Sequence, residues 1–103
     1  MTTVRHILFP YDFSVRARQI IPFVRAIVHR TCARLALFIV VPRSFAPLSM
    51  PVGQIVRMVV EEAVRERADL LILGRGSVAE PFGRLRTHAF GIIQRSPCPV
   101  ISV

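Results

Sequence analysis

Residue types that mark several common protein classes are scarce in this 103-residue sequence. It has no tryptophan and no lysine, and its two cysteines, Cys32 and Cys98, are far apart and outside any Cys-x-x-Cys pair. This usage excludes the disulfide framework of a small secreted protein and gives no zinc or dithiol motif. The three histidines have no cysteine or carboxylate at metal-ligand spacing, so we expect no metal site.

Long apolar runs are also missing. The longest, residues 35–42 and 70–73, fall short of the roughly 18 residues that a membrane-spanning helix needs. The opening residues do not resemble a signal peptide, because proline and aspartate interrupt them early. We therefore expect a cytoplasmic protein without a membrane partner. At 52% hydrophobic residues the chain is too apolar for disorder, and its length suits a single domain over residues 1–103.

Acidic residues are few: six stand against 14 arginines, which gives a formal net charge of +8. Glu61, Glu62 and Glu66 lie on one predicted helix, where a solvated face explains them, so the paired carboxylates of a hydrolase are not indicated. We expect no enzymatic activity. The positive field favours phosphate-bearing or acidic partners, although arginine in place of lysine is also explained by genome composition.

The apolar periodicity predicts alternating strands and helices. Strands are expected at residues 4–9, 35–41, 69–73 and 100–103, and helices at 15–31, 52–67 and 83–95. We expect the first strand to stop at Pro10, because proline cannot donate to a central ladder, and the first helix to be kinked or to start late at Pro22. The unbroken apolar run at 35–41 is typical of a strand covered on both faces. This order predicts an α/β fold, a three-layer sandwich around an open, mostly parallel sheet.

Two segments with candidate binding residues follow strands. Asp12 comes shortly after the first strand, and Gly-Arg-Gly-Ser at 74–77 directly follows the third. Ligands of open parallel sheets bind beyond the carboxyl ends of the strands, so the two segments would line one crevice if these strands are neighbours. Small residues there allow backbone N–H groups to approach a phosphate. The plainer alternatives are that Asp12 begins a turn, that Ser14 caps the next helix, and that the glycines form a tight connection.

Three segments resemble the universal stress protein family. Residues 7–14, Ile-Leu-Phe-Pro-Tyr-Asp-Phe-Ser, are similar to its first strand with the following aspartate and serine. Residues 68–76 are similar to its fourth strand and glycine loop, and residues 96–103 to its closing strand. The resemblance covers most of the chain in order. It implies an α/β sandwich that acts in stress response as a binding or regulatory module for ATP or another adenine nucleotide.

The resemblance also implies a nucleotide site. In nucleotide-binding members the aspartate lies near the adenine or ribose, and a Gly-x-x-Gly, nine-residue spacer, Gly-Ser/Thr motif holds the phosphates. Carried over, together with backbone contacts at the end of the second strand, this gives Asp12, Val41, Gly74, Gly76, Arg86 and Thr87. The sequence departs from this motif in two ways. One residue, instead of two, separates the first two glycines, and Arg86 takes the place of a glycine. An arginine there either supplies guanidinium contacts to phosphate or fills the pocket.

The middle of the chain is shorter than the family pattern. Residues 42–67 have room for a connection and one helix, where the family has a helix, a strand and another helix. The missing helix and edge strand imply a four-stranded sheet of order 2-1-3-4 with three main helices. The strand at 35–41 then becomes an edge, which we expect residues 42–51 or another subunit to cover. At the opposite edge, Val100–Val103 is expected to form a homodimer, as in the family.

The residues alone also allow a second class of function. The arginines would also suit a basic interaction module that binds nucleic acid or an acidic protein without any nucleotide pocket. Ionic strength separates the two classes, because binding through many phosphates weakens steeply with salt.

Overall fold

The computed structural model describes residues 3–39, 52–74 and 89–103, which alternate between strands and helices. The elements are β1 (His6–Tyr11), α1 (Val15–Gln19), α2 (Ile21–Thr31), β2 (Arg34–Ile39), α3 (Val52–Arg65), β3 (Leu70–Leu73), α4 (Ala89–Arg95) and β4 (Val100–Ser102). All strand pairs are parallel, and the sheet order is β2-β1-β3-β4. The predicted α/β class and strand order are confirmed. Two predicted stretches, the connection 42–51 and the helix start 83–88, lie outside the described residues.

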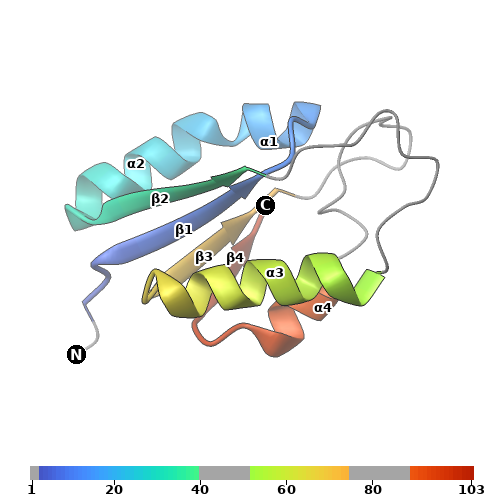
Figure 1. The fold of residues 1–103 in the computed structure, drawn as a ribbon. Coiled ribbons are helices and arrows are strands. Elements are labelled where there is room, and N and C mark those ends of the chain that lie inside the picture. The colour runs from blue at the N-terminus through green and yellow to red at the C-terminus, as the bar shows by residue number, and fades with distance from the viewer. Residues whose placement is uncertain (1–2, 40–51, 75–88) are drawn as a thin grey trace.

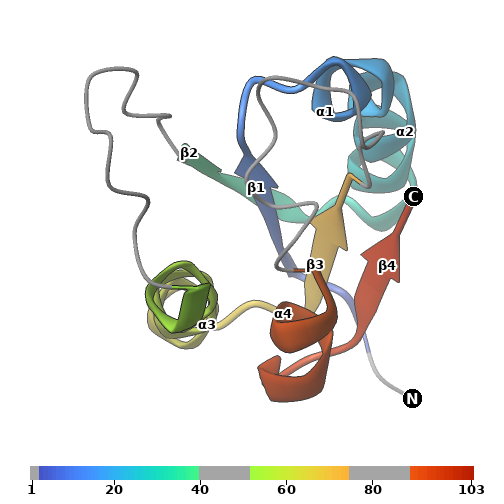
Figure 2. The ribbon, with the colours of Figure 1, turned by 90° about the vertical axis from the view of Figure 1, so that its right-hand side faces the viewer.

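The sheet is the middle of three layers (Figures 1 and 2). Helices α1 and α2 lie on one face, and α3 and α4 lie on the other. Successive side chains of a strand point to opposite faces, and β1 carries apolar side chains on both faces. Ile7 and Phe9 pack with Val24 of α2, whereas Leu8 packs with Val59 of α3. The two cores therefore meet back to back across β1 and its neighbour β3.

A break at Ile20 divides the first helical segment into α1 and α2. The backbone of Ile20 is at φ −90° and ψ 0°, and Pro22 occupies the first turn of α2. Proline is tolerated there because the first N–H groups of a helix have no partner within the helix. Of the two predicted effects of Pro22, a kink or a late start, the structure shows an interruption: the helical segment begins at Val15, as expected, and breaks at Ile20.

The prediction that β1 stops at Pro10 is wrong, since the strand continues to Tyr11. The Arg5 carbonyl accepts the Arg34 N–H at the start of β2, and the His6 carbonyl accepts the Asp69 N–H just before β3. The backbone N–H and C=O groups of even-numbered residues in β1 therefore point toward β3, and those of odd-numbered residues point toward β2. Pro10 is even, and the registered pairs of β1 with β3 end at Leu8. The missing N–H of Pro10 thus falls beyond those pairs, and the registered pairing with β2 continues past it.

The prediction that β2 is covered on both faces is also wrong. Ala36 and Phe38 pack against the core beneath α3. On the other face, however, Leu35, Leu37 and Ile39 are 46%, 55% and 47% exposed. An unbroken apolar run predicts a strand with two apolar faces, but it does not say whether the layers extend far enough to cover both.

At the amino edge of the sheet, a carboxylate holds the start of β1 against the start of β3. Asp69 Oδ2 accepts the backbone N–H groups of Arg5 (2.9 Å) and His6 (3.0 Å). These two hydrogen bonds lower the pKa of Asp69 from its usual value, because they favour the charged form.

We predict that Asp69→Asn lowers the melting temperature at neutral pH, although the amide keeps one acceptor oxygen. Because the pKa of Asp69 is lower in the folded chain than in the unfolded one, its carboxylate adds stability above the unfolded pKa of about 3.9. That stability is lost as the pH falls through the lowered folded value, so the difference between variant and parent should shrink in acid. Thermal unfolding followed by circular dichroism measures it, with the exposed Glu61→Gln as control. A difference that grows on acidification would contradict the assignment.

Candidate functional site

The carboxyl edge of β1 and β3 brings together the two segments that the sequence singled out. The strands are neighbours in register, with Ile7 paired to Leu70. Asp12 directly follows β1, and Gly74 directly follows β3. Gly74 also lies against the helix after Asp12, since a Cβ placed on it would be 3.3 Å from Ala17 Cα. The two segments therefore meet at the first turns of α1.

Asp12 and Ser14 shape the turn between β1 and α1. Both are buried, at 3% and 2% exposure. Asp12 Oδ1 accepts the Ser14 N–H at 3.1 Å, and Ser14 Oγ accepts the Ala17 N–H at 3.0 Å. The second bond caps α1 by supplying an acceptor to one of its first N–H groups. The plainer interpretations, a turn at Asp12 and a helix cap at Ser14, are thus confirmed, and a ligand role for Asp12 stays a prediction.

Phe13, which lies between these two residues, was missed in the sequence analysis. Phe13 has a φ of 64°, a left-handed conformation that is uncommon and costly for a bulky residue, and its side chain is 44% exposed. Its ring packs edge-on against Tyr11 at 5.1 Å between centroids, and Tyr11 packs in the same way against Phe9 at 5.9 Å. The three aromatic residues at alternate positions 9, 11 and 13 were the available signal.

The remaining residues of the predicted nucleotide site lie outside the described residues. These are Val41, Gly76, Arg86 and Thr87. The described half of the site is therefore the corner of Asp12, Gly74 and the first turns of α1, and the phosphate half stays a prediction.

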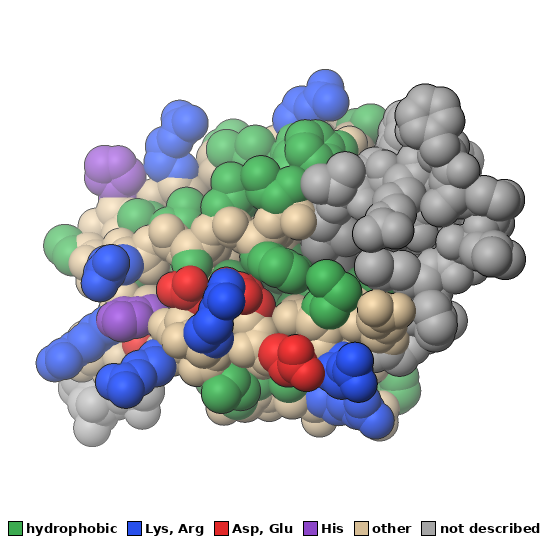
Figure 3. Space-filling view, in the orientation of Figure 1, with side chains coloured by type: hydrophobic (Ala, Val, Ile, Leu, Met, Phe, Trp, Pro, Cys, Tyr) green, Lys and Arg blue, Asp and Glu red, His purple; other side chains and the backbone are tan. Residues whose placement is uncertain are grey.

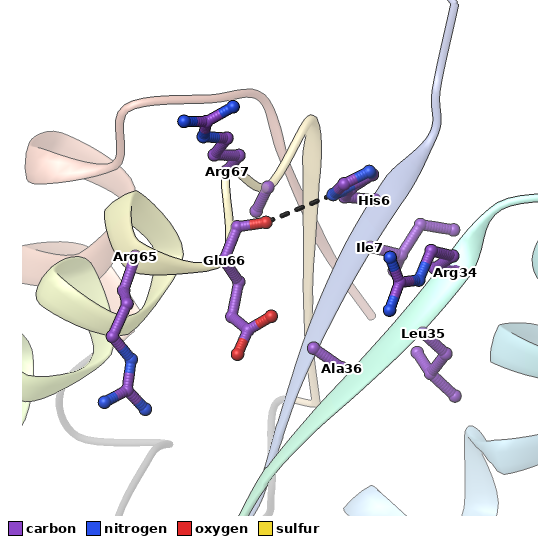
Figure 4. Close-up of a pocket in the computed structure, with 9 residues that line it drawn as sticks. His6, Ile7, Arg34, Leu35, Ala36, Arg65, Glu66 and Arg67 are labelled. Atoms are coloured by element: carbon purple, nitrogen blue, oxygen red, sulfur yellow. Dashed lines mark hydrogen bonds between the residues drawn. The ribbon is translucent and has the colours of Figure 1, made fainter.

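A second hollow lies at the opposite, amino edge of the sheet, with a volume of about 240 Å³. Figure 4 shows the Glu66 carboxylate between the end of α3 and the strands β1 and β2, with Arg65 and Arg67 extending away from it. Arg65 is already paired with both oxygens of Glu62, at 2.7 and 2.9 Å, and the Glu66 carbonyl is 3.2 Å from His6 Nδ1. This hollow mixes both signs of charge, so it is a weaker anion site than its arginines suggest.

The carboxyl-edge corner thus remains the candidate site. Comparisons with protein-family models and with curated proteins found no match to this chain. The resemblance to universal stress proteins therefore rests on the residues quoted above. Within residues 3–39, 52–74 and 89–103, no group of three histidine, cysteine or acidic side chains could hold a metal ion, and no helix is both long and apolar enough to cross a bilayer.

We predict that Gly74→Val lowers the free energy of unfolding by about 1–3 kcal/mol, the usual cost of forcing extra carbon into a packed site. The added Cβ would meet the backbone of Ala17, which cannot move aside without shifting α1. Urea unfolding measures the change. The exposed Ala26→Val in α2 is the control, expected to cost no more than about 0.7 kcal/mol, through the lower helix propensity of valine. Equal stability of Gly74→Val and the parent would show that α1 is not packed on this glycine.

Proposed function

We propose that this protein is a cytoplasmic, non-enzymatic module similar to universal stress proteins, which binds ATP or another adenine nucleotide at the carboxyl edge of β1 and β3 and acts in regulation of a stress response. Asp12 is placed toward the ribose or base, Val41 offers backbone contacts, and Gly74 and Gly76 lie near the phosphates with Arg86 and Thr87.

One observation carries the proposal: β1 and β3 are neighbours in the order β2-β1-β3-β4. From β1 the chain runs to β2 on one side, and after α3 it returns to β3 on the other side. A reversal of this kind leaves a crevice beyond the carboxyl ends of the two central strands, where α/β proteins bind ligands. Asp12 and Gly74 both stand at that point, against the same short helix.

Calorimetric titration with ATP and magnesium tests the proposal. We predict binding to the parent protein, weakened about tenfold in Asp12→Asn, because the amide keeps an acceptor for Ser14 N–H but loses the charge that favours hydroxyl donors. Glu66→Gln, the same change at the opposite edge, is the matched control and should bind like the parent. Absence of heat at near-millimolar ATP would overturn the proposal.

Titrations with ATP and with a short nucleic acid, each at two salt concentrations, separate the nucleotide pocket from the basic-module alternative. A protein contacting many phosphates of a nucleic acid loses roughly a thousandfold or more in affinity between about 50 and 200 mM salt. A single nucleotide held at the carboxyl edge should lose far less.

We further propose that the protein is a homodimer through Val100–Val103. Strand β4 is an edge among the described strands, and its alternate residues bond to β3, as the Val103 N–H does to the Leu73 carbonyl. By the same alternation, the N–H of Ser102 faces away from β3, toward the free edge. A second copy would pair with that edge by strand addition.

Sedimentation tests the dimer. We predict that the parent is a dimer at micromolar concentration and that Ser102→Pro is a monomer, because proline removes the outward N–H and leaves the bonds to β3 in place. Ser102→Ala is the control and should remain dimeric, since the Ser102 hydroxyl is buried without a partner among the described residues. Because each copy carries +8, the dimer should strengthen as salt is raised. A monomeric parent would remove the dimer proposal.

A further inference from the structure

An apolar groove runs between α2 and β2, away from the candidate nucleotide site. Helix α2 packs over β1 and β3 through Val24, which leaves the same face of β2 uncovered. The groove has a volume of about 380 Å³; Leu35 and Leu37 form its floor with Tyr11, and α2 forms its wall. Figure 3 shows hydrophobic side chains gathered over α2 and β2 on this side of the molecule.

The free edge of β2 borders this groove. The Arg34 N–H donates to β1, so the backbone groups of even-numbered residues in β2 point toward β1 and those of odd-numbered residues point outward. The outward backbone groups therefore belong to Leu35, Leu37 and Ile39, whose side chains are also the exposed ones. No residue in the described part of the chain pairs with this edge. The same three residues thus present unpaired backbone groups and apolar side chains.

The charge around the groove is of one sign. Arg25 and His29 belong to the α2 wall, and Arg34 begins β2 at one end. None of the groove-lining residues in the described part of the chain is acidic, and the chain as a whole carries +8. A second copy of the chain would bring two such basic rims together, whereas a partner rich in carboxylates would find opposite charge on the wall.

We infer that β2 and this groove bind an extended acidic peptide segment of another protein. The segment adds as a fifth strand along the outward backbone groups of Leu35, Leu37 and Ile39, which supplies main-chain hydrogen bonds. On the face of the segment that lies over the groove, apolar side chains cover Leu35 and Leu37, and carboxylates reach Arg25 and the ring N–H of His29. Both kinds of side chain therefore stand at every second position, and the positions between them face the other side of the sheet. This site is independent of nucleotide binding at the carboxyl edge.

A defined peptide tests the inference: the seven residues Val-Thr-Glu-Thr-Val-Thr-Glu, in which valine and glutamate alternate on the face toward the groove, labelled with fluorescein and followed by fluorescence anisotropy. We expect saturable binding to the full chain and binding weaker by about tenfold to the analogue with lysine in place of glutamate. Methylating one set of alternate backbone nitrogens of the peptide should abolish binding, while methylating the other set should be tolerated, because only alternate N–H groups of an added strand face its neighbour.

Matched variants locate the site. Leu37→Asn should weaken binding of the acidic peptide by about tenfold, because it removes exposed apolar surface from the floor. Val64→Asn, which replaces a similarly exposed aliphatic side chain of α3 by the same amide, should not. Arg25→Glu should reverse the preference toward the lysine peptide, while Arg57→Glu on α3 should keep it.

Three results would overturn the inference. One is no binding of the acidic peptide at near-millimolar concentration. Another is equal loss in the groove variants and in their α3 controls. The third is a dimer in sedimentation that Leu37→Asn dissociates, because it would show that a second copy occupies the groove.

Discussion

The structure depends on β1 being buried on both faces and paired on both sides. Leu8 belongs to the core under α3, and Ile7 and Phe9 belong to the core under α2, so one strand joins the two halves of the molecule. Its amino end is fixed to β3 by the Asp69 carboxylate, which accepts two backbone N–H groups of the strand. A strand held in this way has one register, because a slip by one residue would exchange the side chains of the two cores. The position of every residue that follows it, Asp12 included, is set by that register.

Both proposed surfaces begin at the end of this strand. The buried Asp12 turns the chain toward α1 at the carboxyl edge, while Tyr11, one residue before it, lies in the groove beside β2. Phe13, in its left-handed conformation, packs on Tyr11. A bulky residue keeps such a backbone conformation only where its surroundings fix it, and here the capped helix on one side and the ring of Tyr11 on the other do so. The turn between β1 and α1 is therefore held in one conformation by its contacts, as a binding site requires.

Much of the architecture could be predicted from the sequence, because the residues of both cores recur at the apolar spacings typical of strands and helices. The apolar runs of β1 and β3 predict buried strands, and the apolar stripe of α3 predicts an amphipathic helix. The break before Pro22 follows from the chemistry of proline, which has no backbone N–H to donate within a helix. The strand order came from the resemblance, since periodicity does not identify neighbours. The end of β1 was predicted wrongly because the effect of Pro10 depends on which neighbour its nitrogen faces, and that is a property of register. For the site, the sequence could pair Asp12 with Gly74 but gave no sign that the Asp12 carboxylate also holds the turn.

The exposed apolar face of β2 does not contribute to the stability of the fold. Edge strands are normally protected by charge, proline or cover, but within Arg34–Ile39 the single charged residue stands at the first position. Burying Leu35, Leu37 and Ile39 would stabilise the chain, at about 25 cal/mol per Å² of apolar surface removed from water. The arginines beside this edge limit what can take that place, because a second copy docked here would bring its own Arg25 and Arg34 against them, whereas an acidic segment is attracted. The local positive charge that opposes pairing of β2 with its own copy therefore selects the kind of partner this edge can accept.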